Sequence, residues 1–332
     1  MSLLEFTERG IYCQRAGVFI DPWNSVPKAL ITHAHSDHAH PGCQQYLCTS
    51  RTAPLLKHRL GAHQNVQSLE FGEAVNINGV SFSFHPAGHI VGSAQIRAEH
   101  QGEVWVVSGD YKIQSDRISE DFEILKCHTF VTESTFGLPV YRWPDQDWVY
   151  EEINTWWQGN RENNVTSVIS AYTLGKAQRI IHNINHSIGP VFCHGAVESI
   201  NDILRKIGVN IRHTRHVSDE VHKDEFKGAL VIAPGSALNT PWMKRFKDYS
   251  TAAASGWMIL RGRKRWQNVD KGFVLSDHAD WSELNTTIRA TGCEQVIVTH
   301  GYSDIFTQWL QSNGYPARVG KTAYEGENGE AG

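Results

Sequence analysis

The sequence predicts a mixed α/β fold, and three features of the chain point to it. Short runs rich in β-branched and aromatic residues fill the first 133 positions, and several end in histidine, aspartate or glycine. From position 165 onward, strand-like runs alternate with helical runs, which is the pattern of parallel strands joined by helices. Near position 271, strand-like runs that end in polar residues appear again. We therefore expect one domain of two segments, 1–137 and 271–332, interrupted by an inserted domain at 138–270.

The first segment is expected to consist mainly of strands. Its strand-like runs are GVFIDPW (17–23), KALITHA (28–34), YLCTS (46–50), VSFSFHPAGH (80–89), EVWVVSGDY (103–111) and TFVTESTFG (129–137). Polar residues at the ends of such strands are where α/β folds tend to place their chemistry.

The inserted segment opens with a helical stretch that carries Trp148, Trp156 and Trp157. Strands are then expected at 165–172, 189–195, 228–237 and 256–262, with helices at 174–187 and 196–208. After 271, two further runs with polar ends, KGFVLSDHADW and EQVIVTHGYSD, each precede a helix. The acidic, glycine-rich tail at 324–332 is expected to be disordered.

Composition limits the classes of protein to consider. The 332 residues carry a net charge of −4, so a general basic excess for nucleic acid is absent. Six cysteines without a CxxC pair favour buried thiols in a reducing compartment. The first residues lack the apolar core of a signal peptide, and no run reaches the length of a membrane span. We expect a cytoplasmic protein with no membrane partner.

The segment ITHAHSDHAHPG at 31–42 is the strongest local signal in the chain. Imidazoles and carboxylates bind zinc and related divalent ions. In extended backbone, residues two apart point the same way, so His33 and His35 can bind one ion. Asp37 and His38 follow where a helix can begin and can turn toward a second ion. His40 falls outside this spacing and is expected near the site or on the surface.

Later strand ends supply the remaining candidate ligands, which are His89, Asp110 and His300. Any one of them alone is more easily explained as an ordinary polar loop residue. The HxHxDH spacing, together with three later candidate ligands at strand ends, favours a metal site over ordinary polar loop residues. Zinc is the favoured ion, and manganese and iron are the alternatives.

THAHSDH resembles the HxHxDH motif of the metallo-β-lactamase superfamily. The resemblance implies an αββα sandwich with the metal site at one edge of its sheets. Asp21 in FIDPW resembles the aspartate that orients the ligand loop, and His89 and Asp110 match later motifs. By this resemblance, one zinc ion would take His33, His35 and His89. The other would take Asp37, His38 and His300, with Asp110 bridging the two ions.

TESTFG, SDHADW and THGYSD resemble three motifs of the β-CASP nucleases, a branch with an inserted cap domain. The match assigns Glu133, His278 and His300 to those motifs. Nearly the whole chain resembles the bacterial ligase-associated DNA exonucleases, relatives of the Artemis and crosslink-repair nucleases. The resemblance implies a DNA exonuclease of DNA repair that works 5′ to 3′ on single strands. An ATP-dependent DNA ligase and a helicase are the implied partners.

One residue departs from the pattern of the DNA-cutting relatives. The eukaryotic members that cut DNA lack a histidine at the third motif, whereas RNA-cutting members have one, and this chain has His300. An RNA-processing nuclease therefore stays open as the alternative. A small-molecule metallo-hydrolase is a further alternative that the metal motif alone permits, although Glu133 and His278 argue against it.

The expected chemistry is hydrolysis of a phosphodiester. Two ions about 3.5–4 Å apart can hold the phosphate and activate a water molecule. His278 would donate a proton to the leaving oxygen, and Glu133 would fix its tautomer. Asp37 is counted with these two as a catalytic residue.

Two segments are candidates for binding the nucleic acid. SAYTLGKAQ is expected to start a helix whose free amides suit phosphate, which makes candidates of Ser170, Tyr172, Thr173, Gly175 and Lys176. A plain strand–turn–helix is the equal alternative. The run RGRKRWQNVDK brings together Arg261, Arg263, Lys264 and Arg265, with Trp266 beside them as a surface for a base. A solvated loop is the other explanation of this run.

Overall fold

The computed structural model describes residues 2–260 and 268–323 of the chain. The described residues form two compact units, one of residues 2–142 and 278–323 and the other of residues 143–260 and 268–277. Helices and three sheets are present, so the predicted mixed α/β class is confirmed. The basic run at 261–265 and the tail at 324–332 lie outside the described residues.

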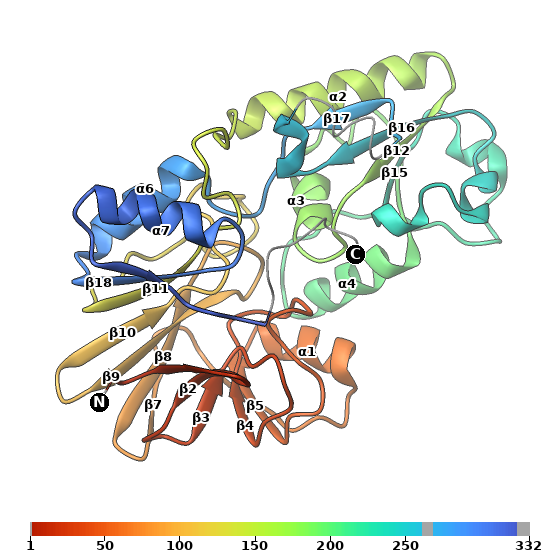
Figure 1. The fold of residues 1–332 in the computed structure, drawn as a ribbon. Helices are drawn as coiled ribbons and strands as arrows, with labels where there is room; N and C mark the ends of the chain where they lie inside the picture. The colour runs from red at the N-terminus through yellow and green to blue at the C-terminus, as the bar shows by residue number, and fades with distance from the viewer. Residues whose placement is uncertain (1, 261–267, 324–332) are drawn as a thin grey trace. The chain divides into compact units, whose positions relative to one another are not determined.

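The first unit contains two sheets (Figure 1). In the N-terminal sheet, the first three strands are antiparallel neighbours and the last four are parallel. Its strands, in order, are β1 (Glu5–Thr7), β2 (Gly10–Cys13), β3 (Val18–Ile20), β4 (Lys28–Leu30), β5 (Gln45–Thr49) and β6 (Val66–Leu69).

The second sheet of this unit has seven strands in the order β19-β18-β11-β10-β9-β8-β7. They are β19 (Ala317–Val319), β18 (Gln295–Thr299), β11 (Thr129–Glu133), β10 (Glu103–Val107), β9 (Ala94–His100), β8 (Val80–Pro86) and β7 (Ala74–Ile77). The four strands from β19 to β10 are parallel. The ends of β10, β11 and β18 therefore meet at one edge of the sheet.

Two apolar cores hold this unit together. In one, Val18, Ile20 and Leu30 of the N-terminal sheet pack with Phe82 and Ile96 of the seven-stranded sheet. Burial of each such side chain contributes about 1.5–3 kcal/mol. In the other core, the opposite face of the seven-stranded sheet is covered by α6 (Trp281–Thr291) and α7 (Ser303–Ser312), as Figure 1 shows. α1 (Thr52–Leu60) follows β5.

The start of α6 is fixed by a capping box. The Asp280 carboxylate accepts a hydrogen bond from Glu283 N at 2.8 Å, and the Glu283 carboxylate accepts one from Asp280 N at 3.0 Å. Such reciprocal bonds satisfy two amide donors that the first turn leaves open. Because Asp280 lies two residues after His278, the cap also limits the path of the chain at that histidine.

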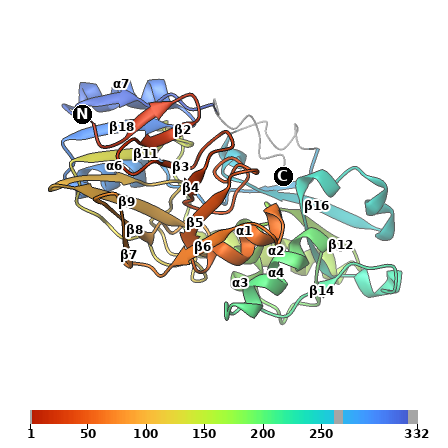
Figure 2. The same cartoon turned by 90° about the horizontal axis from the view of Figure 1, so that it is seen from below.

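The second unit is built on a six-stranded sheet in which every pair of neighbours is parallel. Its order is β14 (Arg215–His216), β13 (Val191–Cys193), β15 (Leu230–Ala233), β12 (Thr166–Ser170), β16 (Tyr249–Ala254) and β17 (Lys271–Phe273). Figure 2 shows β12, β14 and β16 with the helices of this unit beside them.

Among the described residues of this unit, three helices and four short 3-10 turns accompany these strands. The helices are α2 (Gln146–Glu162), α3 (Lys176–Asn183) and α4 (Gly195–Lys206), and the turns are η1 (Lys223–Phe226), η2 (Gly235–Ala237), η3 (Pro241–Arg245) and η4 (Gly256–Ile259). α2 packs against β12 and β17, and α4 packs against β13, β14 and β15. Phe226, Met243 and Phe246 cover Val168 and Val231 of the sheet.

Two local expectations differ from the structure, and one strand was missed. The strand expected at 256–262 begins as η4, because the Ser255 hydroxyl caps it by accepting from Trp257 N at 3.2 Å. The strand of this region is β16, whose alanines have low β propensity but are small enough for a buried parallel sheet. β17 pairs with β16 in the second unit, although residues from 271 onward were expected in the first domain.

Helices long and apolar enough to cross a membrane are absent from the part of the chain that the structure describes. The six cysteines are free thiols, and all except Cys293 are buried, which confirms the expectation from their spacing. Burial raises the pKa of Cys48 and Cys127 to about 12, so these thiols stay protonated at neutral pH.

Candidate metal centre

Four loops at the strand ends of the first unit bring the predicted ligands together. His33, His35, Asp37 and His38 follow β4, and His89 follows β8. Asp110 follows β10, and His300 follows β18. The histidines from β4 were expected on an extended strand with a helix after it. The strand instead ends at Leu30, and the ligand loop makes a single turn in which Ala39 N donates to His35 O at 3.1 Å.

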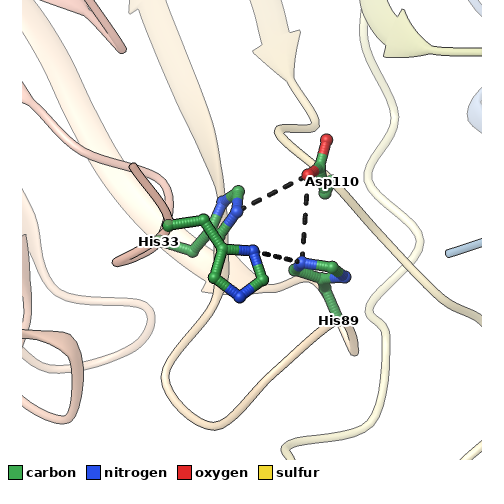
Figure 3. A group of neighbouring side chains, drawn as sticks. His33, His89 and Asp110 are labelled. Carbon is green, nitrogen blue, oxygen red and sulfur yellow. Dashed lines mark hydrogen bonds and ion pairs between the residues drawn. The ribbon is translucent and has the colours of Figure 1, made fainter. Parts of the chain in front are cut away.

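The first group of side chains consists of His33, His35, His89 and Asp110, all buried, with one candidate ligand atom each within 4.8 Å of the others. One carboxylate oxygen of Asp110, Oδ2, lies 3.5 Å from His33 Nε2 and 3.8 Å from His89 Nε2. His89 Nε2 lies 3.1 Å from His35 Nδ1. Figure 3 shows the contacts of His33 and His89 with Asp110.

The second group consists of Asp37, His38 and the same Asp110. His38 Nε2 lies 3.3 Å from Asp110 Oδ2 and 3.7 Å from Asp37 Oδ2. The His300 ring stacks on the His38 ring with 5.2 Å between centroids, and both line one pocket with Asp37. Asp110 therefore stands between two sets of potential ligands.

Two nitrogens in these groups are buried without a hydrogen-bond partner, namely His33 Nε2 and His38 Nε2. Leaving a buried polar atom unsatisfied costs about 1–3 kcal/mol, so such atoms call for a partner. Both nitrogens face Asp110 Oδ2. Imidazole nitrogens and a carboxylate form the donor set of a divalent transition metal, so these residues fit metal ions.

The electrostatics of the cluster also suit a cation. Burial, with the neighbouring His38 and His35, lowers the pKa of His33 well below its usual value, which keeps that imidazole neutral. Burial alone would also lower the pKa of His38, but the Asp110 and Asp37 carboxylates outweigh it and raise that pKa. Burial would raise the pKa of Asp110, yet the charges of His38 and His278 hold it well below the usual range. Positive charge is therefore favoured between these carboxylates.

Asp21 stabilises the ligand loop, which is the segment after β4 that carries the four candidate ligands from His33 to His38. Its carboxylate accepts hydrogen bonds from Thr32 N at 2.8 Å and from the Thr32 hydroxyl at 2.5 Å, and it lies 2.8 Å from His38 Nδ1. A carboxylate on one imidazole nitrogen directs the other nitrogen toward a metal. Asp21 has a left-handed φ of 41°, an unusual conformation that this set of contacts maintains.

Glu133 and His278 form a buried pair beside the cluster. His278 Nδ1 lies 2.9 Å from one carboxylate oxygen of Glu133 and 3.2 Å from the other. Tyr111 N donates to the same carboxylate at 2.8 Å. The His278 ring lies 4.7 Å from the His89 ring, and Asp110, Glu133 and His278 make a third possible ligand group. Glu133 thus fixes the orientation of an imidazole at the edge of the site.

The turn after β18 sets the position of His300. His300 has φ 52° and Gly301 has φ 68°. A Cβ atom on Gly301 would lie 2.4 Å from the carbonyl oxygen of Ser134, so no other residue fits there without displacing backbone. The Ser134 hydroxyl donates to the His300 carbonyl oxygen, and Tyr302 N donates to Ser134 O at 3.0 Å.

The other described candidate residues belong to none of the three ligand groups. His40 is outside the three groups, and its Nδ1 lies 2.6 Å from Pro41 O. In the second unit, Ser170 ends β12, and Tyr172, Thr173 and Gly175 lie between β12 and α3. Lys176 is buried, and its ammonium lies 3.7 Å from the Asp277 carboxylate. Arg261, Arg263, Lys264, Arg265 and Trp266 lie outside the described residues.

Two residues near the site were not predicted. Thr32 bonds to Asp21 and lies 3.1 Å from His33 Nδ1, and its position directly before the histidine motif was the available signal. Arg179 on α3 is buried and donates to Ser276 O and, at 3.2 Å, to Asp277. Both acceptors directly precede His278. The only sign of Arg179 in the sequence was a charged residue among the apolar positions of a predicted helix.

Comparison with known proteins finds relatives that are named for acting on nucleic acids. No protein-family model matches it. A probable DNA ligase of Opitutus terrae is 29% identical over 93% of this chain and 30% of its own length. The cleavage and polyadenylation specificity factor 73 of Drosophila melanogaster is 21% identical over 72% of this chain and 42% of its own length. The RNase aCSPSF2 of Saccharolobus solfataricus is 22% identical over 72% of this chain and 56% of its own length.

The chain thus spans less than two thirds of each of these relatives. Among solved structures, a protein of unknown function from Enterococcus faecalis superposes with a TM-score of 0.61, over 90% of this chain and 80% of the other. The two share 12% sequence identity, so this likeness concerns the fold alone.

Proposed function

We propose, from the confirmed resemblance of this chain to the β-CASP nucleases of the metallo-β-lactamase fold, that it is a metal-dependent DNA exonuclease. One observation carries the proposal. A buried cluster of histidines and carboxylates, two of whose nitrogens have no hydrogen-bond partner, adjoins a carboxylate–histidine pair at one sheet edge. Such a site combines a place for metal with a candidate proton donor.

The proposal extends to the architecture. We assign the two packed sheets of the first unit, with α1 on one side and α6 and α7 on the other, to the αββα sandwich. The second unit, residues 143–277, is assigned to the cap predicted at 138–270. Its parallel sheet, inserted in the chain between β11 and β18, supports this assignment.

We further propose that the first group holds one zinc ion and that Asp37, His38 and His300 hold a second, with Asp110 shared. Two divalent ions in such a site polarise a phosphodiester and make a water molecule acidic enough to attack it. Asp37 is counted as catalytic because it is the least buried of these carboxylates and lines the pocket with His300.

The remaining steps fall to residues of the chain itself. His278 donates a proton to the oxygen that leaves phosphorus, which prevents an alkoxide from accumulating. Glu133 holds the ring through Nδ1, so that Nε2 is the nitrogen that carries the transferable proton. Asp21 keeps His38 in place through its Nδ1.

Substrate binding is proposed for Ser170, Tyr172, Thr173 and Gly175 at the start of α3, and for Arg261, Arg263, Lys264 and Arg265. Lys176 is buried beside Asp277, which favours a structural part for that residue. We propose that the enzyme degrades single strands 5′ to 3′ in DNA repair, in the cytoplasm, alongside an ATP-dependent DNA ligase and a helicase. The relative named a probable DNA ligase supports the ligase partner.

A second candidate function is RNA processing. Its support is His300 beside the second ligand group, together with relatives named for RNase activity and for cleavage and polyadenylation.

One experiment tests both candidates. The purified protein, with its metal content measured, is incubated with matched single strands of DNA and RNA labelled at either end. Stepwise release of mononucleotides from the 5′ end of DNA is expected. Cleavage of RNA alone would replace the first proposal by the second, and the absence of any cleavage by metal-loaded protein would refute both.

A further inference from the structure

A groove in the first unit contains none of the candidate metal ligands, and Trp281 is the one residue it shares with the motifs discussed so far. It is a hollow of about 500 Å³ between α6 and α7. Trp281 and Arg289 line it from α6, Trp309 lines it from α7, and Arg142 and Tyr315 complete its wall. A hollow of this size suits a ligand of several rings rather than a single ion.

The charge of the groove is entirely positive. Among the described residues, its lining includes the guanidinium groups of Arg142 and Arg289 and no carboxylate. Within the described ranges, no acidic side chain forms an ion pair with either guanidinium, and Arg142 instead donates to the Ser282 hydroxyl at 3.3 Å. On a chain whose net charge is −4, such a local excess is complementary to an anion.

The groove also presents an ordered aromatic surface. Trp309 is 42% exposed, although its indole is held in place. The indole N–H donates to Asn285 Oδ1 at 3.0 Å, and the ring lies 5.1 Å from the Trp281 ring. An exposed tryptophan that is already ordered loses little entropy when a flat ring stacks on it.

The chemistry of the lining distinguishes between possible occupants. The groove has aromatic rings, guanidinium groups, amides and hydroxyls, but no aliphatic side chain. Rings beside guanidinium groups are the combination that binds the bases and phosphates of an unpaired nucleic-acid strand.

The position of the groove supports the same occupant. α6 begins at Trp281, three residues after His278, and from there to Arg289 it rises about 12 Å. A strand in the groove would thus start close in sequence and structure to the Glu133–His278 pair.

We propose that the groove between α6 and α7 binds single-stranded DNA, with Trp309 stacking on a base and Arg142 and Arg289 contacting its phosphates. The choice of DNA rests on the function proposed above. The groove would hold a strand beyond the nucleotide at the metal centre.

The charge component is tested with Arg142→Gln combined with Arg289→Gln, and with Arg318→Gln as the control. Arg318 is an exposed arginine of the same unit that lies outside the groove. A fluorescent phosphorothioate strand serves as the probe, because it keeps the charges of DNA and resists hydrolysis. The double variant should bind it roughly tenfold more weakly, and the slope of log affinity against log salt should fall by about 0.7 for each lost contact. Unchanged affinity and slope would overturn the proposal.

The stacking component is tested with Trp309→Ala, and Trp148→Ala is the matched control. Trp148 is an exposed tryptophan of the second unit. Trp309→Ala should weaken binding by roughly 5- to 100-fold, and Trp309→Phe should keep most of the affinity. Thermal unfolding shows whether each variant is folded. If Trp309→Ala does not fold, Trp309→Phe and the double arginine variant still test the proposal. Full affinity of the double arginine variant for the strand would refute binding in the groove.

These measurements also separate the groove from the proposed activity. Binding that depends on the groove, in a protein that releases no nucleotide from any strand, would keep this inference and refute the nuclease. If the protein releases nucleotides but the groove variants bind the strand as tightly as the unaltered protein, the nuclease proposal would stand and the groove proposal would be refuted. Tighter, groove-dependent binding of an RNA strand would refute DNA as the ligand.

Discussion

Asp110 is the residue on which both ligand groups depend. Its Oδ2 faces His33, His38 and His89 at 3.3–3.8 Å, so a change at this carboxylate affects every candidate ligand at once. The sequence pattern was sufficient to select it, because it ends an apolar run that reads as a buried strand. The sequence pattern could not show that a single oxygen, Asp110 Oδ2, would face three histidines. That arrangement depends on how four loops come together in the fold.

Asp110→Asn is expected to lower nuclease activity by roughly three orders of magnitude or more, because an amide oxygen carries no charge to share between two cations. Metal content, measured by mass spectrometry, should fall in the same variant. Asp116→Asn offers a control, because that buried aspartate holds the loop at Ile118 and Ser119 and belongs to no ligand group. Full activity in Asp110→Asn would remove this site from the reaction.

His278→Ala separates a proton donor from a metal ligand. A donor contributes about 10²–10⁴ in rate, and the loss should be much smaller with a nitrophenyl phosphodiester, whose leaving group needs no proton. Metal content should stay at the level of the unaltered protein. Equal losses with both substrates, or a loss of metal, would instead make His278 a ligand within the group it forms with Asp110 and Glu133.

At the scale of single elements, the turn between β18 and α7 couples backbone shape to the site. Gly301→Ala should destabilise the fold by about 1–3 kcal/mol and displace His300, because its Cβ would meet Ser134 O. Gly314→Ala is the matched control, since Gly314 also has a positive φ of 84° but has open space around it. Chemical denaturation compares the two. A smaller effect at Gly301 than at Gly314 would contradict this account of the turn.

α4 carries a polar network that makes stability depend on pH. The Glu198 carboxylate accepts hydrogen bonds from Arg205 at 2.7 Å and from the Thr214 hydroxyl at 2.5 Å. Burial alone would raise the pKa of Glu198, but these bonds outweigh it and lower the pKa. Because the folded pKa lies below the unfolded value of about 4.3, this stabilisation is present above that pH and is lost as pH falls through the folded pKa.

Glu198→Gln should therefore cost about 1–2 kcal/mol in the free energy of unfolding at neutral pH. The difference between the two proteins should shrink in acid, where the unaltered carboxyl also becomes neutral. Urea unfolding at several pH values measures this, and the exposed Glu220→Gln serves as the control. A difference that stays constant down to pH 3 would show that the charge is not responsible.

The elements also show what sequence patterns reveal and what they conceal. Strands whose apolar runs end in polar residues, such as β10, β11 and β18, were found because two signals coincide at each. β16 was missed because alanine and serine carry no β signal of their own, and its burial comes from neighbouring strands. The ligand loop was expected to contain a strand and a helix, but Asp21 and Thr32 hold it in an irregular path that no local periodicity encodes.

For the whole molecule, bound metal should be part of the stability of the fold. The cluster joins loops from both sheets of the first unit, and its unsatisfied nitrogens are costly when no cation is present. Removal of metal by a chelator should lower the melting temperature by several degrees, and added zinc should restore it. Asp110→Asn should respond much less to either treatment. A melting temperature unaffected by chelation in the unaltered protein would refute this coupling.

The second boundary between the two compact units differs from the boundary that the sequence suggested for the proposed domains. The structure divides the units after Asp277, whereas the sequence suggested 270. The cause is β17, whose apolar run resembles the strands of the first unit but pairs with β16. Pairing partners of a short parallel strand depend on distant chain segments, which a single sequence does not reveal.

The parallel pairing of β11 with β18 has a consequence for synthesis on the ribosome. Ser134 at the end of β11 bonds to His300, which lies 166 residues later in the sequence. Translation of that interval takes roughly 10–30 s. Throughout this period the nascent chain presents the apolar edge of β11 without its neighbour. The described strands of the intervening unit are complete at Phe273, before β18 is made. The second unit can therefore fold first, and until β18 emerges the unfinished sheet is a natural substrate for chaperones.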